Sequence, residues 1–490
     1  QVAAPDGGVL QLAGSTMRIL DTRVPRPDTR FDLEVSGDVA SALTLIAAEP
    51  LHLLDQFPFD PATVATGTVD LDVQLDLVLR RGLTPQDVDF RIGGTLAQIR
   101  SGTLVPGRDL RADRLTIDAD NTRLEIGGVA QLDTTLADAS WSRAIGPGAS
   151  PDSQIAGTAT LTPAALAGFG VVLPDGMFRG QGYGDFTLDL MPGRAAELTM
   201  QSDLAGIALA IPALGWQLPA AQTGTLLAEV TLGEAPSVPR LEITGAGLDL
   251  SGSIALDGTR FSQLALDHFA IGNWIDVTGG LVDQGGGQPM VRITGTVDLR
   301  GLPQSSETEP GTPGSLPMEI LLDRLTVTDG IYLTDLSAQI GGSPISGDFR
   351  GLVGGSAPVS GTILGETDGM SLRMQSDDGG AVLRAGGIYD NAYGGDFELI
   401  LRPRPGQGNY AGLMTIDNPR LRNAPAFAEL LNLVSVVGLL EQLATGEGVA
   451  LGAVRADFRI SPRAITIVEG TAIGASMGLS LDGVYDTQAE

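Results

Sequence analysis

The residues of this chain that could carry acid–base chemistry are few and scattered. Its two histidines are His52, in the segment EPLHLLD, and His268, which follows Asp267 in LALDHFAIG. An Asp–His pair can act as a general base when a nucleophile lies beside it. Each histidine stands alone among strand-like residues, however, so ordinary strand positions are favoured over catalysis. Two separated histidines without cysteine also do not suit a transition-metal site.

Two further motifs resemble catalytic or phosphate-binding loops. Ser476 lies in GASMG, which has the spacing of a nucleophile elbow, but that elbow needs a downstream histidine and none follows. The glycine-rich stretches 180–184 and 354–358 do not open a helix with a lysine, and all 30 basic residues are arginine. A nucleotide-binding loop is therefore excluded, and the sequence predicts no catalytic residue.

Clustered carboxylates raise the question of calcium binding or glycoside hydrolysis. Asp118, Asp120 and Asn121 lie in IDADN, and Asp377 and Asp378 lie in SDDGG. A calcium loop needs several oxygens at a defined spacing, whereas Asp-Asp-Gly-Gly is equally typical of a hairpin turn, which we favour. Glycosidases need two facing carboxylates and commonly aromatic side chains, which are only 4% of this chain. We expect no metal and no cofactor.

The composition excludes other classes of function. The net charge is −29, which opposes binding to nucleic acid and electrostatic adhesion to an anionic bilayer. There is no cysteine, so disulfides and thiol catalysis are impossible. Hydrophobic residues make up 43% of the 490 positions, so disorder from low hydrophobicity is not expected, and the 67 glycines must serve turns.

Period-two alternation is the dominant structural signal. In TVDLDVQLDLVL, residues 68–79, apolar side chains alternate with carboxylates, as in a strand that is wetted on one face. Similar segments recur along the chain, separated by Gly, Asp, Asn or Pro, and predict antiparallel meanders. We expect a mainly β protein with an elongated, curled antiparallel sheet. The inward candidates on residues 68–79 are Leu71, Val73, Leu75 and Leu77.

Helical signals are confined to three places. PATVA, residues 61–65, predicts a single turn, and TPAALAGFG predicts a short helix near 163–168 with Thr162 as N-cap. Near the C-terminus, residues 426–443 carry apolar side chains at three- and four-residue steps. We expect this segment to cap the sheet rather than to enter a membrane, because it carries no basic residue. The cap residues are Phe427, Leu430, Leu431 and Val434.

One stretch has the composition of a linker. Residues 302–319, LPQSSETEPGTPGSLPME, are rich in Ser, Glu, Thr, Pro and Gly. We therefore expect a β section over 1–301, a flexible linker over 302–319 and a second β section over 320–490. No run approaches the roughly 18 apolar residues that a membrane span needs, and we expect the chain to be part of a longer protein.

Four segments in order resemble the AsmA-like family of Gram-negative envelope proteins, of the YhdP and TamB type. These are FPFDPATVATGTVDLDVQLDLVL, DLAGIALAIPALGWQLPAAQTGTL, DDGGAVLRAGGIYDNAYGGDFELIL and the C-terminal stretch from Pro425 to Asp486. Gln217 and Leu218 depart from the family pattern, which often has lysine after the tryptophan. The resemblance implies a repeating β-groove lined by aliphatic side chains, in a periplasmic protein anchored to the inner membrane by a segment outside this chain.

Two functions follow from these observations. The first is a non-enzymatic conduit in which phospholipid acyl chains lie along the groove between inner and outer membranes, with broad headgroup preference. The second is a structural or assembly scaffold of the cell envelope that contacts other envelope proteins and is built from dry β-sandwiches. A leucine that faces lipid and a leucine in a closed core look alike in sequence, so both hypotheses stay open here. A carbohydrate-binding sandwich is a weaker third.

Overall fold

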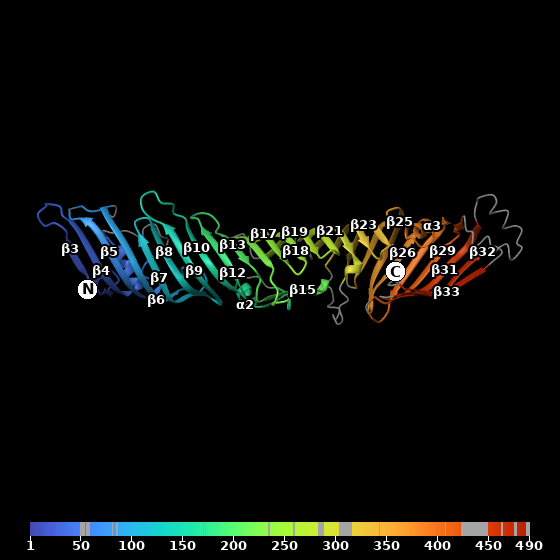
Figure 1. Cartoon of the computed structure of the whole chain (residues 1–490), viewed down its shortest axis with the longest axis horizontal. Coiled ribbons are helices and arrows are strands. Elements are labelled where there is room, and N and C mark those ends of the chain that lie inside the picture. Colours follow the sequence, from blue (N-terminus) through green and yellow to red (C-terminus); the bar gives the residue numbers. More distant parts are fainter. Residues whose placement is uncertain are drawn as a thin grey trace. The chain divides into compact units, whose positions relative to one another are not determined.

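The fold is mainly β, as the alternation predicts. In the computed structural model 63% of the chain is strand and 7% is helix, and 28 strands form one large, mostly antiparallel sheet (Figure 1). The curl and elongation of the sheet stay predictions. The structure describes residues 1–490 apart from 50–53, 55–58, 81, 85–86, 170, 172, 234–235, 258–259, 283–288, 303–315, 343, 407, 423–448, 462–463, 475–477 and 487–490.

Two compact units divide the chain, and each is described by itself. Unit 1 comprises 1–211, 217–246 and 256–259, and unit 2 comprises 212–216, 247–255 and 260–490. The strands up to β17 are β1 (Val2–Ala3), β2 (Val9–Leu10), β3 (Thr16–Ile19), β4 (Asp28–Asp38), β5 (Thr66–Val78), β6 (Val88–Ser101), β7 (Leu110–Asp120), β8 (Arg123–Leu132), β9 (Thr135–Ala144), β10 (Ser153–Leu161), β11 (Phe178–Gly180), β12 (Gly182–Leu190), β13 (Glu197–Ser202), β14 (Ile207–Ile211), β15 (Trp216–Leu218), β16 (Thr225–Thr231) and β17 (Ser237–Gly245).

The remaining strands continue the same sequential order. They are β18 (Leu248–Asp257), β19 (Arg260–Ile271), β20 (Ile275–Val282), β21 (Met290–Asp298), β22 (Met318–Thr326), β23 (Tyr332–Gly341), β24 (Ser346–Val353), β25 (Ala357–Glu366), β26 (Gly369–Ser376), β27 (Ala392–Tyr393), β28 (Asp396–Pro403), β29 (Tyr410–Asp417), β30 (Arg420–Leu421), β31 (Val449–Ser461), β32 (Ala464–Gly474) and β33 (Gly478–Asp486).

Three α-helices occur in the described residues, together with the 3₁₀ turns η2 (Pro212–Leu214) and η3 (Leu299–Gly301). Helix α2 (Pro163–Gly168) confirms the predicted short helix, and the Thr162 hydroxyl accepts a hydrogen bond from the Ala165 amide at 3.0 Å. Helix α1 (Val39–Ala47) was not predicted.

Helix α3 (Gly379–Ala385) corrects the prediction of a hairpin turn at SDDGG. Asp378 is its N-cap, with a side chain that accepts from the Ala381 and Gly394 amides. Asp-Gly-Gly is compatible with both structures, and here the side-chain oxygen satisfies one of the free amides in the first helical turn.

Neighbouring strands of the large sheet pair antiparallel wherever their register is known, with one exception. Strands β21 and β22 are parallel, so that Val291 pairs with Met318 and Val297 with Leu325. The predicted linker, 302–319, therefore joins two paired strands inside unit 2, and the division between the compact units falls earlier in the chain.

Residues 426–443, predicted to form the helical cap, lie outside the described residues, as do all four cap side chains. Within the part of the chain that the structure describes, no helix has both the length and the apolar character needed to cross a membrane.

Candidate functional site

The four inward candidates share one face of the sheet in unit 1. Their cross-strand partners are apolar or small on both sides: Leu71 lies between Val35 and Gly94, and Val73 lies between Leu33 and Ile92. Directly paired residues point to the same face, so these side chains form rows across the strands. We call this side of the sheet the apolar face of unit 1. It comprises all positions in register with Leu71, Val73, Leu75 and Leu77.

One such row crosses unit 1 without a polar side chain. It starts on β4 and ends on β16, and each member is the direct register partner of the next. Glycine occupies one position of the row, and every other member carries an apolar side chain. In order the members are Val35, Leu71, Gly94, Ile117, Ile126, Trp141, Ile155, Leu188, Leu198 and Val230.

Unit 2 carries an equivalent apolar face. A row of direct register partners runs from β19 to β33, and every member is apolar or glycine. Period-two alternation places the apolar side chains of each strand on this face. Bulges in β19, β22, β23 and β32 keep them on the same face where the strand register shifts. The members are Leu266, Gly279, Ile293, Ile320, Ala338, Phe349, Gly361, Met374, Leu399, Met414, Ala456, Gly470 and Leu481.

Among the described residues, a helix packs against one side of each apolar face. In unit 1, α1 packs its Val39 against Ile99 and Ala112, beside the ends of β4 and β6 and the starts of β5 and β7. In unit 2, Val382 and Leu383 of α3 pack against the strand ends that carry Val353, Ala357, Phe397 and Ile416. We call this side of each unit the covered rim and the opposite strand ends the open rim.

The four inward candidates on β5 are only half-buried. Leu71, Val73, Leu75 and Leu77 are all intermediate between buried and exposed. In a dry sandwich a second sheet would lie on these leucines at about 10 Å and bury them fully. The described strands instead form the large sheet, a two-stranded sheet of β1 and β2 and a three-stranded sheet of β11, β14 and β15.

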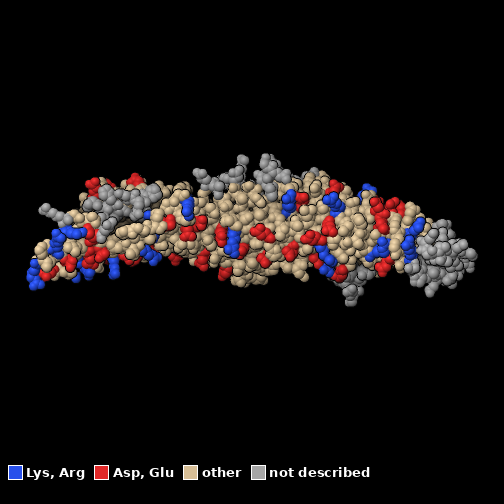
Figure 2. All heavy atoms as spheres, turned by 90° about the horizontal axis from the view of Figure 1, so that it is seen from above, with Lys and Arg blue, Asp and Glu red and all other residues tan. Residues whose placement is uncertain are grey.

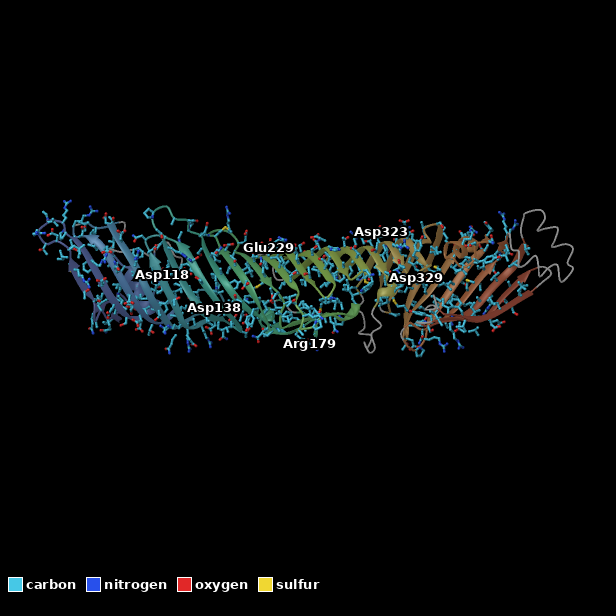
Figure 3. All side chains as sticks on the ribbon, viewed as in Figure 1. Asp118, Asp138, Arg179, Glu229, Asp323 and Asp329 are labelled. Carbon is cyan, nitrogen blue, oxygen red and sulfur yellow. The ribbon has the colours of Figure 1, made fainter. Side chains whose placement is uncertain are left out.

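The opposite face is polar and rich in carboxylates. Asp118 on β7 and Asp138 on β9, both labelled in Figure 3, belong to it. Acidic side chains are interspersed with arginines over the surface in Figure 2. Cross-strand ion pairs join Arg30 to Asp76 at 2.7 Å and Arg292 to Glu319 at 2.7 Å. The Arg30 hydrogen bond lowers the pKa of Asp76, but exposed pairs of this kind add little stability.

The described residues of the IDADN carboxylate cluster make local contacts within the sheet. Asp120 accepts hydrogen bonds from Thr122 and the Arg123 amide in the turn after β7, which lowers its pKa. Asn121 links the turn to β6 through the Phe90 amide and the Val88 carbonyl. No group of three or more potential metal ligands occurs within the described ranges.

His268 does not pair with Asp267. Its imidazole lies 3.2 Å from a carboxylate oxygen of Asp276 and 3.9 Å from one of Asp249, on neighbouring strands. No nucleophile accompanies it in these contacts. His52 and Ser476 fall outside the described residues, and Ser476 is flanked by the strands β32 and β33 rather than by a strand and a helix.

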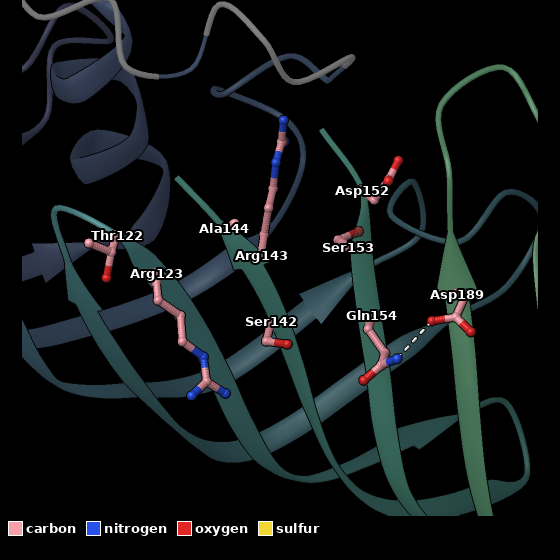
Figure 4. A pocket seen from close by; sticks show the side chains of 9 residues that line it. All are labelled: Thr122, Arg123, Ser142, Arg143, Ala144, Asp152, Ser153, Gln154 and Asp189. Carbon is pink, nitrogen blue, oxygen red and sulfur yellow. Dashed lines mark hydrogen bonds between the residues drawn. The ribbon is translucent and has the colours of Figure 1, made fainter. Parts of the chain in front are cut away.

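Sequence reasoning overlooked one residue of the apolar face. Arg143, near the end of β9, is in direct register with Leu124 and Ser153 and is only 8% exposed. In Figure 4 its side chain points away from the side on which Arg123 and Gln154 lie. All three residues line an open depression of about 470 Å³ at these strand ends, where Gln154 donates to Asp189 at 2.7 Å.

Comparison with protein-family models, curated proteins and solved structures finds no match. The site must therefore be interpreted from its own geometry. That geometry offers wide apolar faces, a polar reverse side and no described constellation of nucleophile, base and oxyanion donors.

Proposed function

We propose that the chain is a non-enzymatic lipid-binding protein whose apolar faces hold the acyl chains of phospholipids. The observation that carries the proposal is the unbroken apolar row across β4 to β16, on a face whose central side chains are half-buried. Large contiguous apolar surfaces left open to water are typical of binding sites. Acyl chains would bind there by burial, at about 25 cal/mol per Å² of apolar surface removed from water.

The setting of this activity is proposed from the sequence. The resemblance to AsmA-like proteins supports transport of phospholipid between the inner and outer membranes, in a periplasmic protein anchored by a segment outside this chain. A groove with one covered rim and one open rim suits that role, because a headgroup could stay in water while the acyl chains lie on the sheet. The sheet arrangement offers no support for a scaffold of dry β-sandwiches.

The proposal is tested first by mass spectrometry of lipids that copurify with the protein. We expect glycerophospholipids in the organic extract. A second test uses Val73→Asp with Leu75→Asp, which places two charges on the apolar face at a cost of several kcal/mol wherever lipid excludes water. Crosslinking to a photoreactive phospholipid should fall to background, while circular dichroism stays that of the parent.

The chain offers a matched control of the same residue types. Val129 and Leu136 are each 49% exposed and lie on the polar face, in register with Asp138 and Gln131. Val129→Asp with Leu136→Asp should therefore leave crosslinking unchanged. Outright unfolding of the Val73 and Leu75 variant, with no lipid in the parent extract, would favour the dry-sandwich scaffold instead.

A further inference from the structure

One charged side chain interrupts the apolar face of unit 1. Among the described residues of β4 to β17 that are in register with that face, Arg143 is the sole charged one. It follows Trp141 on the same side of β9, and its row runs from Leu33 through Val73, Ile92, Ala119 and Leu124 to Arg143 and Ser153.

Arg143 also lies where a headgroup would meet the sheet. Strand β9 ends at Ala144, at the open rim. The three positions before Arg143 on the same face, Ala137, Ala139 and Trp141, are apolar. One lipid leaflet is roughly 15 Å of hydrocarbon, half of a bilayer core, and corresponds to about five residues of strand. An acyl chain laid along β9 from Arg143 would thus contact only apolar side chains.

The chemistry of the side chain selects the ligand. Arg143 as a whole residue is 8% exposed, so its side chain is largely desolvated, and a desolvated guanidinium is stabilised by an anion beside it. Arg143 already takes part in an interaction within the chain, but its five N–H donors can hold a further acceptor, and their planar fork matches phosphate. The net charge of −29 gives no general attraction for anionic lipid, so a local cation is needed for such selection.

We propose that Arg143 binds the phosphate of a glycerophospholipid whose acyl chains lie on the apolar face of unit 1. This inference rests on the proposed function and adds to it a preference for lipids that carry a phosphate. It also replaces the expectation of broad, purely apolar binding.

The experiment compares two lipids that differ only in the headgroup. The whole chain is incubated with vesicles containing phosphatidylglycerol and diacylglycerol with identical acyl chains, reisolated and extracted for mass spectrometry. The parent should retain phosphatidylglycerol over diacylglycerol, relative to the vesicle composition. Arg143→Leu should lower that ratio about tenfold, the loss expected for a hydrogen bond between charged groups, while total bound lipid stays the same. Arg143→Lys should keep an intermediate ratio.

Arg123→Leu is the control, because Arg123 lies at the same strand ends on the polar face and pairs with Glu125 at 2.6 Å. It should behave as the parent. If Arg143→Leu retains the parent ratio, the inference is wrong and Arg143 is structural. If no protein, including the parent, retains lipid, the proposed function itself fails. Should Arg143→Leu not fold by circular dichroism, Arg143→Gln carries the same test with the same outcomes.

Discussion

At the scale of single residues, glycines decide how closely the strands approach on the apolar face. A side chain on Gly94, which is in register with Leu71, would place its Cβ 2.3 Å from the Asp70 carbonyl oxygen and 2.8 Å from the Leu71 Cα. The adjacent Gly93 points to the polar face, and its Cβ would meet nothing within 4 Å. Close approach on the apolar side favours the predicted curl, because glycine kinks are a known source of sheet curvature.

This pair of glycines yields a stability prediction. Gly94→Ala should lower the free energy of unfolding by about 1–3 kcal/mol, because the neighbouring strand must shift to admit the methyl group. Gly93→Ala should change it by less than about 0.5 kcal/mol. Urea denaturation monitored by circular dichroism measures both, and equal effects would contradict the close approach described for Gly94.

A second residue-scale prediction concerns Asp87, just before β6. Its carboxylate accepts from the Thr84 amide at 3.0 Å and the Thr84 hydroxyl at 2.9 Å and pairs with Arg80, which together lower its pKa from 3.8 to about 2. A depressed pKa stabilises the folded state above pH 3.8, and this contribution is lost as the pH falls toward 2. An NMR titration that follows the Asp87 carboxyl carbon should show a midpoint near pH 2. If the contacts with Thr84 and Arg80 are absent, the midpoint should lie at the ordinary value of 3.8.

At the scale of elements, α3 closes the covered rim of unit 2 through few side chains. Leu383 is 8% exposed and packs into the cluster around Phe397 and Ile416. Leu383→Ala should destabilise the protein by about 2–5 kcal/mol through lost burial and a residual cavity. Ile388, just after the helix, is 58% exposed, so Ile388→Ala should cost less than about 1 kcal/mol. Similar midpoints for both variants in urea would show that α3 does not cover the sheet.

The sequence predicted strands better than it predicted the elements that cover them. Alternation around Leu71 and Val73 identified both the strand and its inward face, since period two is set by the backbone alone. Helix α1, VASALTLIA, resembles a strand because three of its nine residues are Val, Thr or Ile. Arg143 was overlooked because the outward Leu136 and the inward Ala137 and Ala139 leave no clear alternation on β9, so its face follows only from the register with β8 and β10.

At the scale of the whole molecule, the surface charge and the apolar faces have opposite effects on solubility. The net charge of −29 keeps copies apart at neutral pH, and the calculated isoelectric point is about 4.3. Charge repulsion should vanish near that pH, where the open apolar faces would then associate. Light scattering during acid titration should rise most steeply near pH 4.3. A nonionic detergent at about 0.1% should suppress the rise by covering the apolar faces. Unchanged scattering with detergent would indicate that polar contacts drive association.

The one parallel pair among the described strand registers, β21 with β22, has a consequence for how the chain folds. Most antiparallel neighbours follow directly along the chain, so much of the sheet can grow by local hairpin closure, which is fast. Parallel pairing of Val291 with Met318 cannot start from a tight turn, so a loop longer than a hairpin turn must close before any strand contact is gained. This junction is therefore expected to form late during synthesis, after the hairpins on either side have formed. Slow refolding phases should depend on it more than on the directly connected hairpins of unit 2.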